Sequence, residues 1–326
     1  MLRFEVGADD LLHSRFALSP LFELENLLRV LAGMSSRRLP AAWASRLAPT
    51  FAQLRRHTEL DAILALFSHR YGPNFVVPPP QSLAQSIEDD LAAVRATPLK
   101  VVRAEIAQSL RHRPTSDPRI LGVLHGRDVL TRVADVLEQT WRELIAQDWP
   151  QLRAICERDV IHRSTELSRA GWAAALAGLH PSVSWRDDGI DIQRLNHPAP
   201  IKLGGAGLLF IPSVFIWPKL AVHSDDPWPK AIVYPARGTA SLWEPPAVTS
   251  GALADLVGRS RAMLLLALAD PASTTQLAHT TGLAIGSVGD HLRLLEKAGL
   301  LSSARSGRSV LYRRTPLGDV IAGIGT

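Results

Sequence analysis

The stretch STTQLAHTTGLAIGSVGDHLRLLEKAGL, residues 273–300, carries the clearest structural signal in the sequence. Ser273 or Thr274 can cap a short helix that ends at Gly282, because glycine tolerates the left-handed backbone of a tight turn. A second helix is expected over 285–297, with apolar residues at three- and four-residue steps that pack inward: Val288, Leu292 and Leu295. The stretch therefore predicts two helices joined by a tight turn.

The opposite face of helix 285–297 carries small and polar residues. Small residues at its start allow a close backbone approach, Ser287 can bond a base or a phosphate, and Arg293 can neutralise a phosphate. Asp290 repels phosphate, so it either accepts from a cytosine amino group or holds Arg293 or His291 in place. This face and the start of the preceding helix are typical of a recognition surface for duplex DNA, and its candidate residues are Thr274, Thr275, Gly286, Ser287, Gly289, Asp290, His291 and Arg293.

A β-hairpin is expected directly after the second helix. Its strands cover 300–305 and 310–314, joined at Ser306-Gly307-Arg308. Arg305 and Arg308 flank the tip, and arginine side chains there can enter a minor groove or clamp its phosphates. Residues 300–314 are therefore predicted to form a basic wing.

Further helices flank this arrangement. An apolar helix over 261–268 stops at Asp270-Pro271, where proline cannot continue the hydrogen bonds. Thr315-Pro316 caps a last helix over 317–324. Together these elements predict a winged helix-turn-helix over 251–326.

This C-terminal region resembles the ArsR-like winged helix-turn-helix regulators. The resemblance rests on Gln276-Leu277-Ala278, Gly282-Leu283, Ser287-Val288, His291-Leu292-Arg293-Leu294-Leu295, Lys297-Ala298-Gly299-Leu300 and Gly307-Arg308. It implies a cytoplasmic transcription regulator, a repressor in most members, that binds an inverted repeat in double-stranded DNA as a homodimer. Two recognition helices would then lie about one DNA turn apart, roughly 34 Å.

Two departures from the family pattern narrow this expectation. Metal sensors of the family place a cysteine pair on the helix before the turn, where this chain has Gln276, Leu277 and Ala278. We therefore expect no metal site of that kind. Family dimers commonly pair a long final helix, but little sequence follows Ile324, so we expect the N-terminal helices to supply dimer contacts.

Residues 1–245 are expected to form a separate regulatory and dimerisation domain, mainly helical over 20–179 and β-rich over 183–243. Short apolar runs in the β-rich part predict a small antiparallel sheet, to which Arg3 to Val6 can add a strand. The fold class is thus α+β. Phe210-Ile211-Pro212-Ser213-Val214-Phe215 and Tyr234-Pro235-Ala236-Arg237-Gly238 resemble the uncharacterised N-terminal domain of an actinobacterial-type ArsR-like group, which brings no known activity.

Composition excludes several protein classes. The chain has 326 residues, a formal net charge of +5 and one cysteine, Cys156, so no intrachain disulfide or cysteine-rich zinc site is possible. No secretion signal is visible at 1–16 and no apolar run reaches the ~20 residues of a membrane span. Walker, GxSxG and HExxH motifs are absent, so we expect no catalytic residue, no cofactor and no membrane contact.

Other groups of polar or aromatic residues allow both a functional and a structural interpretation. His223, Asp225 and Asp226 fit a metal site or, more simply, a polar turn, and Asp187, Asp188 and Asp191 fit a turn better than paired catalytic carboxylates. A basic set could contact phosphate, although a solvated helix face is the simpler reading: Lys100, Arg103, Arg111, His112, Arg113 and Arg119. The tryptophans between Trp141 and Trp243 fill a core or line a pocket for an unknown small-molecule effector.

Two rival hypotheses follow. The N-terminal domain could be a small-molecule enzyme or ligand sensor with an accessory winged helix, motivated by the polar cluster at 223–226 beside aromatics. Alternatively, the winged helix could recruit only protein.

Overall fold

The computed structural model describes residues 1–35, 39–69, 71–187, 189–193, 199–239, 251–306 and 309–322. Within these, the chain divides into two compact units. The first contains Met1–Trp149 and Ala170–Ala236, and the second contains Pro150–Arg169 and Arg237–Thr326. The predicted domain boundary at 245–251 falls almost entirely outside the described residues and stays a prediction. We expected residues 150–169 in the N-terminal domain, whereas their contacts with the rest of the chain place them in the second unit.

The first unit is built mainly of helices, in agreement with the predicted α+β class. Ser19 caps the beginning of α2 (Pro20–Leu31), because its Oγ accepts from the Phe22 N–H and Pro20 takes the first turn. Pro150 likewise lies in the first turn of a long helix. The helices are α1 (Ala8–His13), α2 (Pro20–Leu31), α3 (Ala41–His57), α4 (Leu60–Leu66), α5 (Ile87–Ala96), α6 (Leu99–His112), α7 (Pro118–Leu124), α8 (Val129–Leu144) and α9 (Trp149–Leu176).

Helix α9 belongs to both units. Its residues Pro150–Arg169 group with the second unit, and Trp149 and the residues from Ala170 onward group with the first. Gly171 interrupts the helix with a φ of 77°, a backbone conformation that glycine adopts without strain. The break in helical geometry therefore coincides with the division between the units.

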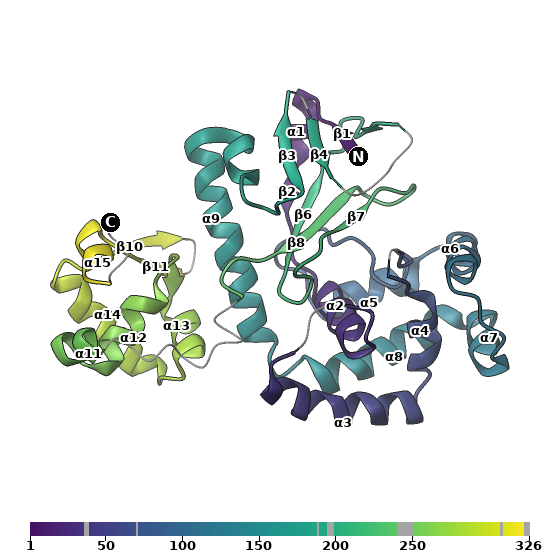
Figure 1. The fold of residues 1–326 in the computed structure, drawn as a ribbon, viewed down its shortest axis with the longest axis horizontal. Coiled ribbons are helices and arrows are strands. Elements are labelled where there is room, and N and C mark those ends of the chain that lie inside the picture. The colour runs from purple at the N-terminus through teal and green to yellow at the C-terminus, as the bar shows by residue number, and fades with distance from the viewer. Residues whose placement is uncertain are drawn as a thin grey trace. The chain divides into compact units, whose positions relative to one another are not determined.

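Two four-stranded sheets, shown with the helices in Figure 1, complete the first unit. In the first sheet the order is β3-β4-β1-β5, and in the second it is β2-β6-β8-β7. The strands are β1 (Leu2–Glu5), β2 (Arg15–Phe16), β3 (Val183–Arg186), β4 (Gly189–Ile192), β5 (Ile201–Lys202), β6 (Leu209–Ser213), β7 (Ala221–His223) and β8 (Ala231–Pro235).

The sheets differ in part from the sequence prediction. The expected N-terminal strand is confirmed, since β1 pairs antiparallel with β4. The single antiparallel sheet is wrong: there are two sheets, and β1–β5, β2–β6 and β6–β8 are parallel pairs. Parallel pairing needs a long crossover, which helices α2 to α9 supply between β2 and β6. Such pairing between distant segments leaves no local signal.

A buried carboxylate joins the beginnings of α2 and α5. Asp90 Oδ2 accepts from the Ser19 hydroxyl (2.8 Å) and the Leu21 N–H (3.0 Å), and its Oδ1 accepts from Gln85 Nε2 (2.7 Å). Three donors satisfy the group, yet burial raises the pKa of Asp90 to about 6. Burial in the first unit therefore disfavours the ionised form of the Asp90 carboxyl group, in spite of its three hydrogen bonds.

The second unit has the predicted winged helix-turn-helix order. Its elements are α11 (Gly251–Val257), α12 (Arg259–Ala267), β9 (Ala272–Ser273), α13 (Thr274–Thr281), α14 (Ile285–Lys297), β10 (Leu301–Ser306), β11 (Ser309–Arg314) and α15 (Pro316–Ile321). One hydrophobic core joins them, with Leu264, Leu277 and Leu292 fully buried. The predicted Thr315 cap and Pro316 first turn of α15 are confirmed. Gly307 and Arg308 lie outside the described residues.

We predict that Asp90 makes stability depend on pH between about 4 and 6. A folded-state pKa above the unfolded value of about 3.9 means that the folded chain binds the proton more tightly. Its contribution is therefore most favourable below pH 4 and falls by on the order of 3 kcal/mol as the pH rises through about 6. Asp90→Asn should remove that dependence, whatever fixed cost the amide brings.

Urea unfolding of both proteins between pH 4 and 7 tests this, followed by tryptophan fluorescence. Every tryptophan except Trp243 lies in the first unit, so the signal reports that unit. The free energy of Asp90→Asn minus that of the parent should rise with pH. A difference that stays constant across the range would contradict the assignment.

Candidate nucleic-acid interface

Specific residues fix the beginning and the end of α13, and so the position of the turn into α14. Ser273 rather than Thr274 is the cap: its Oγ accepts from the Gln276 N–H (3.3 Å), and Gln276 Oε1 accepts from the Ser273 N–H (2.7 Å). At the other end Gly282 has a left-handed φ of 72°. This reciprocal cap and glycine end set where α13 begins and stops, and hence the direction in which α14 leaves.

Helix α14 separates cleanly into a buried and an exposed side. Val288, Leu292 and Leu295 are buried in the core of the second unit, as predicted. On the other side Gly286, Ser287, Asp290 and Arg293 are exposed, while Gly289 is half-buried. The sequence pattern thus placed these candidate residues on the outward surface, although their contact with DNA stays a prediction.

An ion pair occupies part of this exposed side. Arg293 Nη2 donates to Asp290 Oδ1 at 2.8 Å, three residues apart on the helix. Of the two roles considered for Asp290, the structure provides an intrahelical partner for Arg293. Because both side chains are solvent-exposed, the pair contributes about 1 kcal/mol at most. Arg293 can therefore exchange Asp290 for a phosphate at little cost.

The start of α13 lies beside α14. A Cβ built on Gly289 would lie 4.0 Å from Thr274 Cγ2, so these two candidate residues are neighbours. Thr275 is exposed next to Thr274. The candidates on the two helices thus form one continuous surface.

His291 is oriented differently from the other candidates. It is half-buried, and its Nδ1 is buried without a hydrogen-bond partner among the described residues. This nitrogen cannot face a ligand on the outer surface. Any contact with DNA would have to come from the remaining edge of the ring.

The wing is a regular antiparallel hairpin extended by a third strand. β10 pairs with β11 from Leu301↔Arg314 to Ser306↔Ser309, and β11 also pairs with β9. The predicted hairpin is therefore present, while its pairing with Ala272 and Ser273 was not foreseen. Arg305 is exposed at the far end of β10. The candidate Arg308 lies outside the described residues.

The amino-terminal part of α9 contributes to the second unit. Gln276 Nε2 donates to Glu157 Oε2 at 3.3 Å, so the capping residue of α13 is itself held from α9. Arg153 Nε in turn donates to Glu157 Oε1 at 2.8 Å. Nearby, His162 Nδ1 lies 3.9 Å from Asp270 Oδ1, and burial together with Arg237 lowers the pKa of His162. A segment from the N-terminal half thereby supports the helix-turn-helix.

Ile285 is an exposed residue of α14 that the sequence analysis did not select. It occupies the first position of the helix, directly before Gly286. Helical spacing places Ile285 on the side of Val288 and Leu292, so periodicity alone indicated an inward residue. Its exposure depends on where the core of the second unit ends, which helical periodicity does not specify.

The polar cluster around His223 does not converge. His223 Nδ1 contacts Asn74 Oδ1, whereas Asp226 pairs with Lys230 at 2.7 Å and is highly exposed. Asp191, from the other acidic group, pairs with Arg3 at 2.8 Å. Asp188 lies outside the described residues. Among the described residues, no group of three His, Cys, Asp or Glu side chains could hold a metal ion.

The basic set between Lys100 and Arg119 is partly used within the fold. Arg103 donates to the carbonyls of Leu124, His125 and Gly126, which terminate α7. Arg113 donates to the carbonyls of Leu64 and Phe67 at the end of α4. These two arginines therefore stabilise helix ends, which favours the structural interpretation over a phosphate contact for them.

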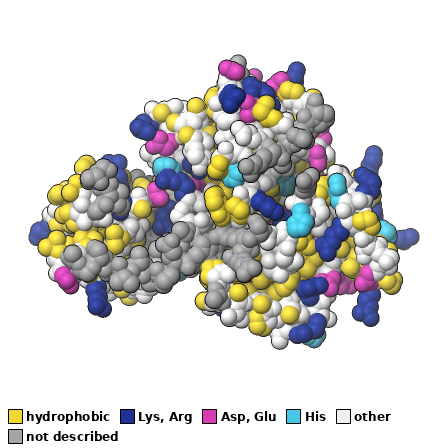
Figure 2. Space-filling view, in the orientation of Figure 1, with side chains coloured by type: hydrophobic (Ala, Val, Ile, Leu, Met, Phe, Trp, Pro, Cys, Tyr) yellow, Lys and Arg dark blue, Asp and Glu magenta, His cyan; other side chains and the backbone are white. Residues whose placement is uncertain are grey.

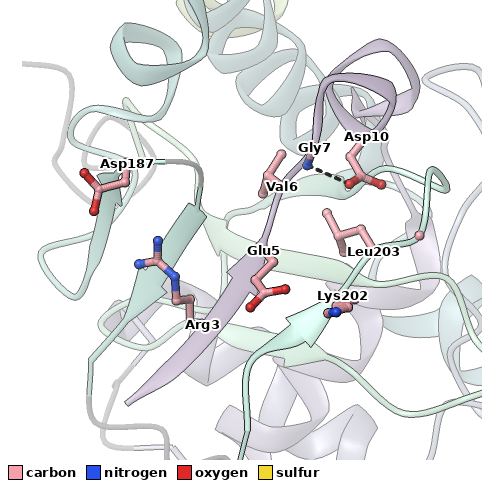
Figure 3. A pocket seen from close by; sticks show the side chains of 9 residues that line it. Arg3, Glu5, Val6, Gly7, Asp10, Asp187, Lys202 and Leu203 are labelled. Carbon is pink, nitrogen blue, oxygen red and sulfur yellow. Dashed lines mark hydrogen bonds between the residues drawn. The ribbon is translucent and has the colours of Figure 1, made fainter.

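A pocket of about 570 Å³ opens between β1, β5 and the turn before β4 in the first unit (Figure 3). Its wall includes Glu5 on β1 and Lys202 on β5, which are register neighbours. Arg3 and Asp10 of the wall are already engaged, because Arg3 pairs with Asp191 and Asp10 accepts from the N–H groups of Gly7 and Gly205. Asp187 adds a further carboxylate to the wall, so the pocket offers the carboxylates of Glu5 and Asp187 and the ammonium group of Lys202.

Comparisons with known proteins match two parts of the chain. Residues 257–303 match the bacterial regulatory proteins of the arsR family, and residues 85–240 match a family of unknown function, DUF5937. Neither the comparison with curated proteins nor that with solved structures gave a match. Within the described residues, no helix has the length and apolar character to cross a membrane.

We predict that Gln276 stabilises the second unit through two separable contacts. Gln276→Ala removes both the cap on Ser273 and the bond to Glu157, and should destabilise α13 by about 1 kcal/mol. Gln276→Glu keeps the cap but places two carboxylates together, so it should be destabilising unless Glu157→Gln is added. Hydrogen exchange of the α13 amides measures the effect. Equal protection for Gln276→Glu with and without Glu157→Gln would refute the contact with α9.

Proposed function

Because residues 257–303 match the arsR-family regulatory proteins, we propose that this chain is a DNA-binding transcription regulator that reads its operator with α14 and the wing. The family match supports the general activity. The proposed interface comprises the exposed residues of α14, the start of α13 and the arginines of the wing. Repression is the proposed direction, since the resembled family mostly represses.

The observation that carries the proposal is a pair of glycines in α14. Gly286 and Gly289 lie within the helix without a positive φ, and each costs about 1 kcal/mol of helix stability relative to alanine. A Cβ built on Gly286 would meet nothing within 4 Å, and one on Gly289 would meet only Thr274 Cγ2 at 4.0 Å. The fold itself therefore does not require either glycine.

Gly318 in the same unit shows the contrasting case. A Cβ there would lie 2.2 Å from the Leu300 carbonyl oxygen, so internal packing demands glycine. No such demand exists at Gly286 or Gly289. A ligand that must approach the α14 backbone closely accounts for both, and the floor and edges of a DNA major groove are such a ligand.

The beginning of α14 adds a second feature suited to DNA. Its N-cap is Ala284, which supplies no side-chain acceptor, and the Val288 N–H is the first to bond back, to the Ala284 carbonyl. The N–H groups of the first turn are therefore available to a phosphate, which the helix dipole also favours. In α13 and α15, by contrast, the side chains of Ser273 and Thr315 accept a hydrogen bond from an N–H group of the first turn.

Exposed aliphatic side chains support assembly as a homodimer. Leu256 on α11 and Leu317 and Val320 on α15 are exposed, while their neighbours Leu253, Val257 and Ile321 pack into or against the core. Figure 2 shows hydrophobic side chains gathered over the visible face of the second unit. Large exposed aliphatics favour a partner surface, so we propose that α11 and α15, rather than N-terminal helices, supply dimer contacts.

The pocket of the first unit supports a role in sensing a small molecule. Its volume falls in the range of ligand sites, roughly 300–1,000 Å³. Glu5 and Lys202 offer opposite charges from adjacent strands (Figure 3). We propose a small ligand that carries both an amino and a carboxylate group, held by these two side chains.

The DNA-binding proposal predicts that Gly286→Ala separates stability from binding. The methyl group enters open space in the free protein, so unfolding should require about 0.5–1 kcal/mol more. The same methyl group would collide with DNA and weaken binding at least tenfold. Fluorescence anisotropy with duplex DNA and thermal melting measure both effects.

The matched control is Gly122→Ala, a glycine inside α7 that also faces open space. It should alter helix stability without changing DNA affinity. Unchanged DNA affinity of Gly286→Ala would remove the main support for α14 as the recognition helix.

The sensing proposal predicts that a free amino acid raises the melting temperature of the first unit. The rise should persist in Lys219→Ala, an exposed lysine outside the pocket wall, and disappear in Lys202→Ala. Thermal scans followed by tryptophan fluorescence measure it across a set of amino acids. If no amino acid stabilises the chain, or if Lys202→Ala responds as the parent does, the pocket is not this site.

A further inference from the structure

Ile285 is a large aliphatic residue exposed at the tip of the proposed recognition helix. Its exposed fraction is 56%, whereas Val288, Leu292 and Leu295 on the same helix are at most 2% exposed. Ile285 is the first residue of α14 and so lies beyond the end of the core that covers the other three. More than half of the surface of Ile285 therefore remains exposed to water in the folded chain.

The residues around Ile285 are small. Ala284 and Gly286 flank it, Ser287 follows, and all three are exposed. The open space beside Gly286 means that no neighbouring side chain competes for the surface that this end of the helix presents. Whatever approaches the beginning of α14 therefore meets an isolated apolar group with backbone on either side.

The major groove of DNA displays one apolar group, the 5-methyl of thymine, among hydrogen-bonding atoms. An isoleucine cannot bond to a donor or acceptor but can bury that methyl group. We propose that Ile285 reads a thymine methyl in each half-site, which rests on the proposed function of α14. Ser287 and Arg293 would contact polar groups, so Ile285 supplies a base preference that they cannot.

The expected size of the effect follows from burial of one methyl group. Removing that group from a contact fully shielded from water lowers affinity about fourfold. Uracil pairs as thymine does and lacks only the 5-methyl, so it isolates this contact. No change of charge or base pairing accompanies the exchange.

The test uses the full-length chain. Binding sites are selected from random duplex DNA, and each thymine of the selected site is then replaced in turn by uracil. The parent protein should lose about three- to fivefold in affinity at one thymine per half-site. Ile285→Ala should bind the thymine site more weakly and show no loss on replacement by uracil, because the partner of the methyl group is gone.

Leu294→Ala is the matched control. Leu294 is 49% exposed on the same helix, nine residues further on, so the substitution removes a comparable exposed aliphatic side chain. Its sensitivity to uracil should equal that of the parent. Circular dichroism of both variants checks that α14 remains folded, which the exposure of both side chains predicts.

The possible results distinguish a failure of the proposed DNA binding from a failure of the proposed Ile285 contact. If the parent selects no DNA sequence, the proposed function fails and this inference fails with it. If the parent selects a site but tolerates uracil at every thymine, or if Ile285→Ala retains the parent's sensitivity, the function stands and the role of Ile285 is refuted.

Discussion

Burial of one face of α14 is the constraint on which the rest of the second unit depends. Val288, Leu292 and Leu295 have to be removed from water together, and α12 and α13 provide the surface that covers them. Once that face is inward, helical geometry leaves Gly286, Ser287, Asp290 and Arg293 outward. Packing of the core thus determines which side chains of α14 are exposed to a ligand.

Local signals were sufficient to predict this arrangement from sequence. The cap at Ser273, the left-handed Gly282 and the Thr315-Pro316 start of α15 each act within a few residues, and the structure has all three. The relation of Asp290 to Arg293 also lies within one helical turn, although the sequence left its partner open. Short-range physics explains why the winged helix-turn-helix was foreseen.

Contacts between segments far apart in the chain could not be predicted from the sequence. Three features join residues far apart in the chain: the parallel pairing of β2 with β6, the buried Asp90 between α2 and α5, and the hydrogen bond that Gln276 donates to Glu157. Neither periodicity nor capping rules encode such pairs. The exposure of Ile285 belongs here too, because it depends on where the core of the unit ends.

The contribution of α9 connects the two halves of the chain. Its amino-terminal turns hold the cap of α13 through Glu157, and its last residues group with the sheets and helices of the first unit. The segment that matches DUF5937 includes this helix. The matched segment therefore includes Glu157, which accepts a hydrogen bond from the capping residue of α13 in the second unit.

Genome-wide footprinting with the purified full-length protein tests the central claim most directly. The account predicts protected duplex sites that share an inverted repeat, with half-sites whose centres lie about one helical turn apart, roughly 34 Å. Protection of single, unsymmetrical sites would contradict the homodimer, and the absence of any protected DNA would contradict the assignment of α14 and the wing as a DNA-binding surface.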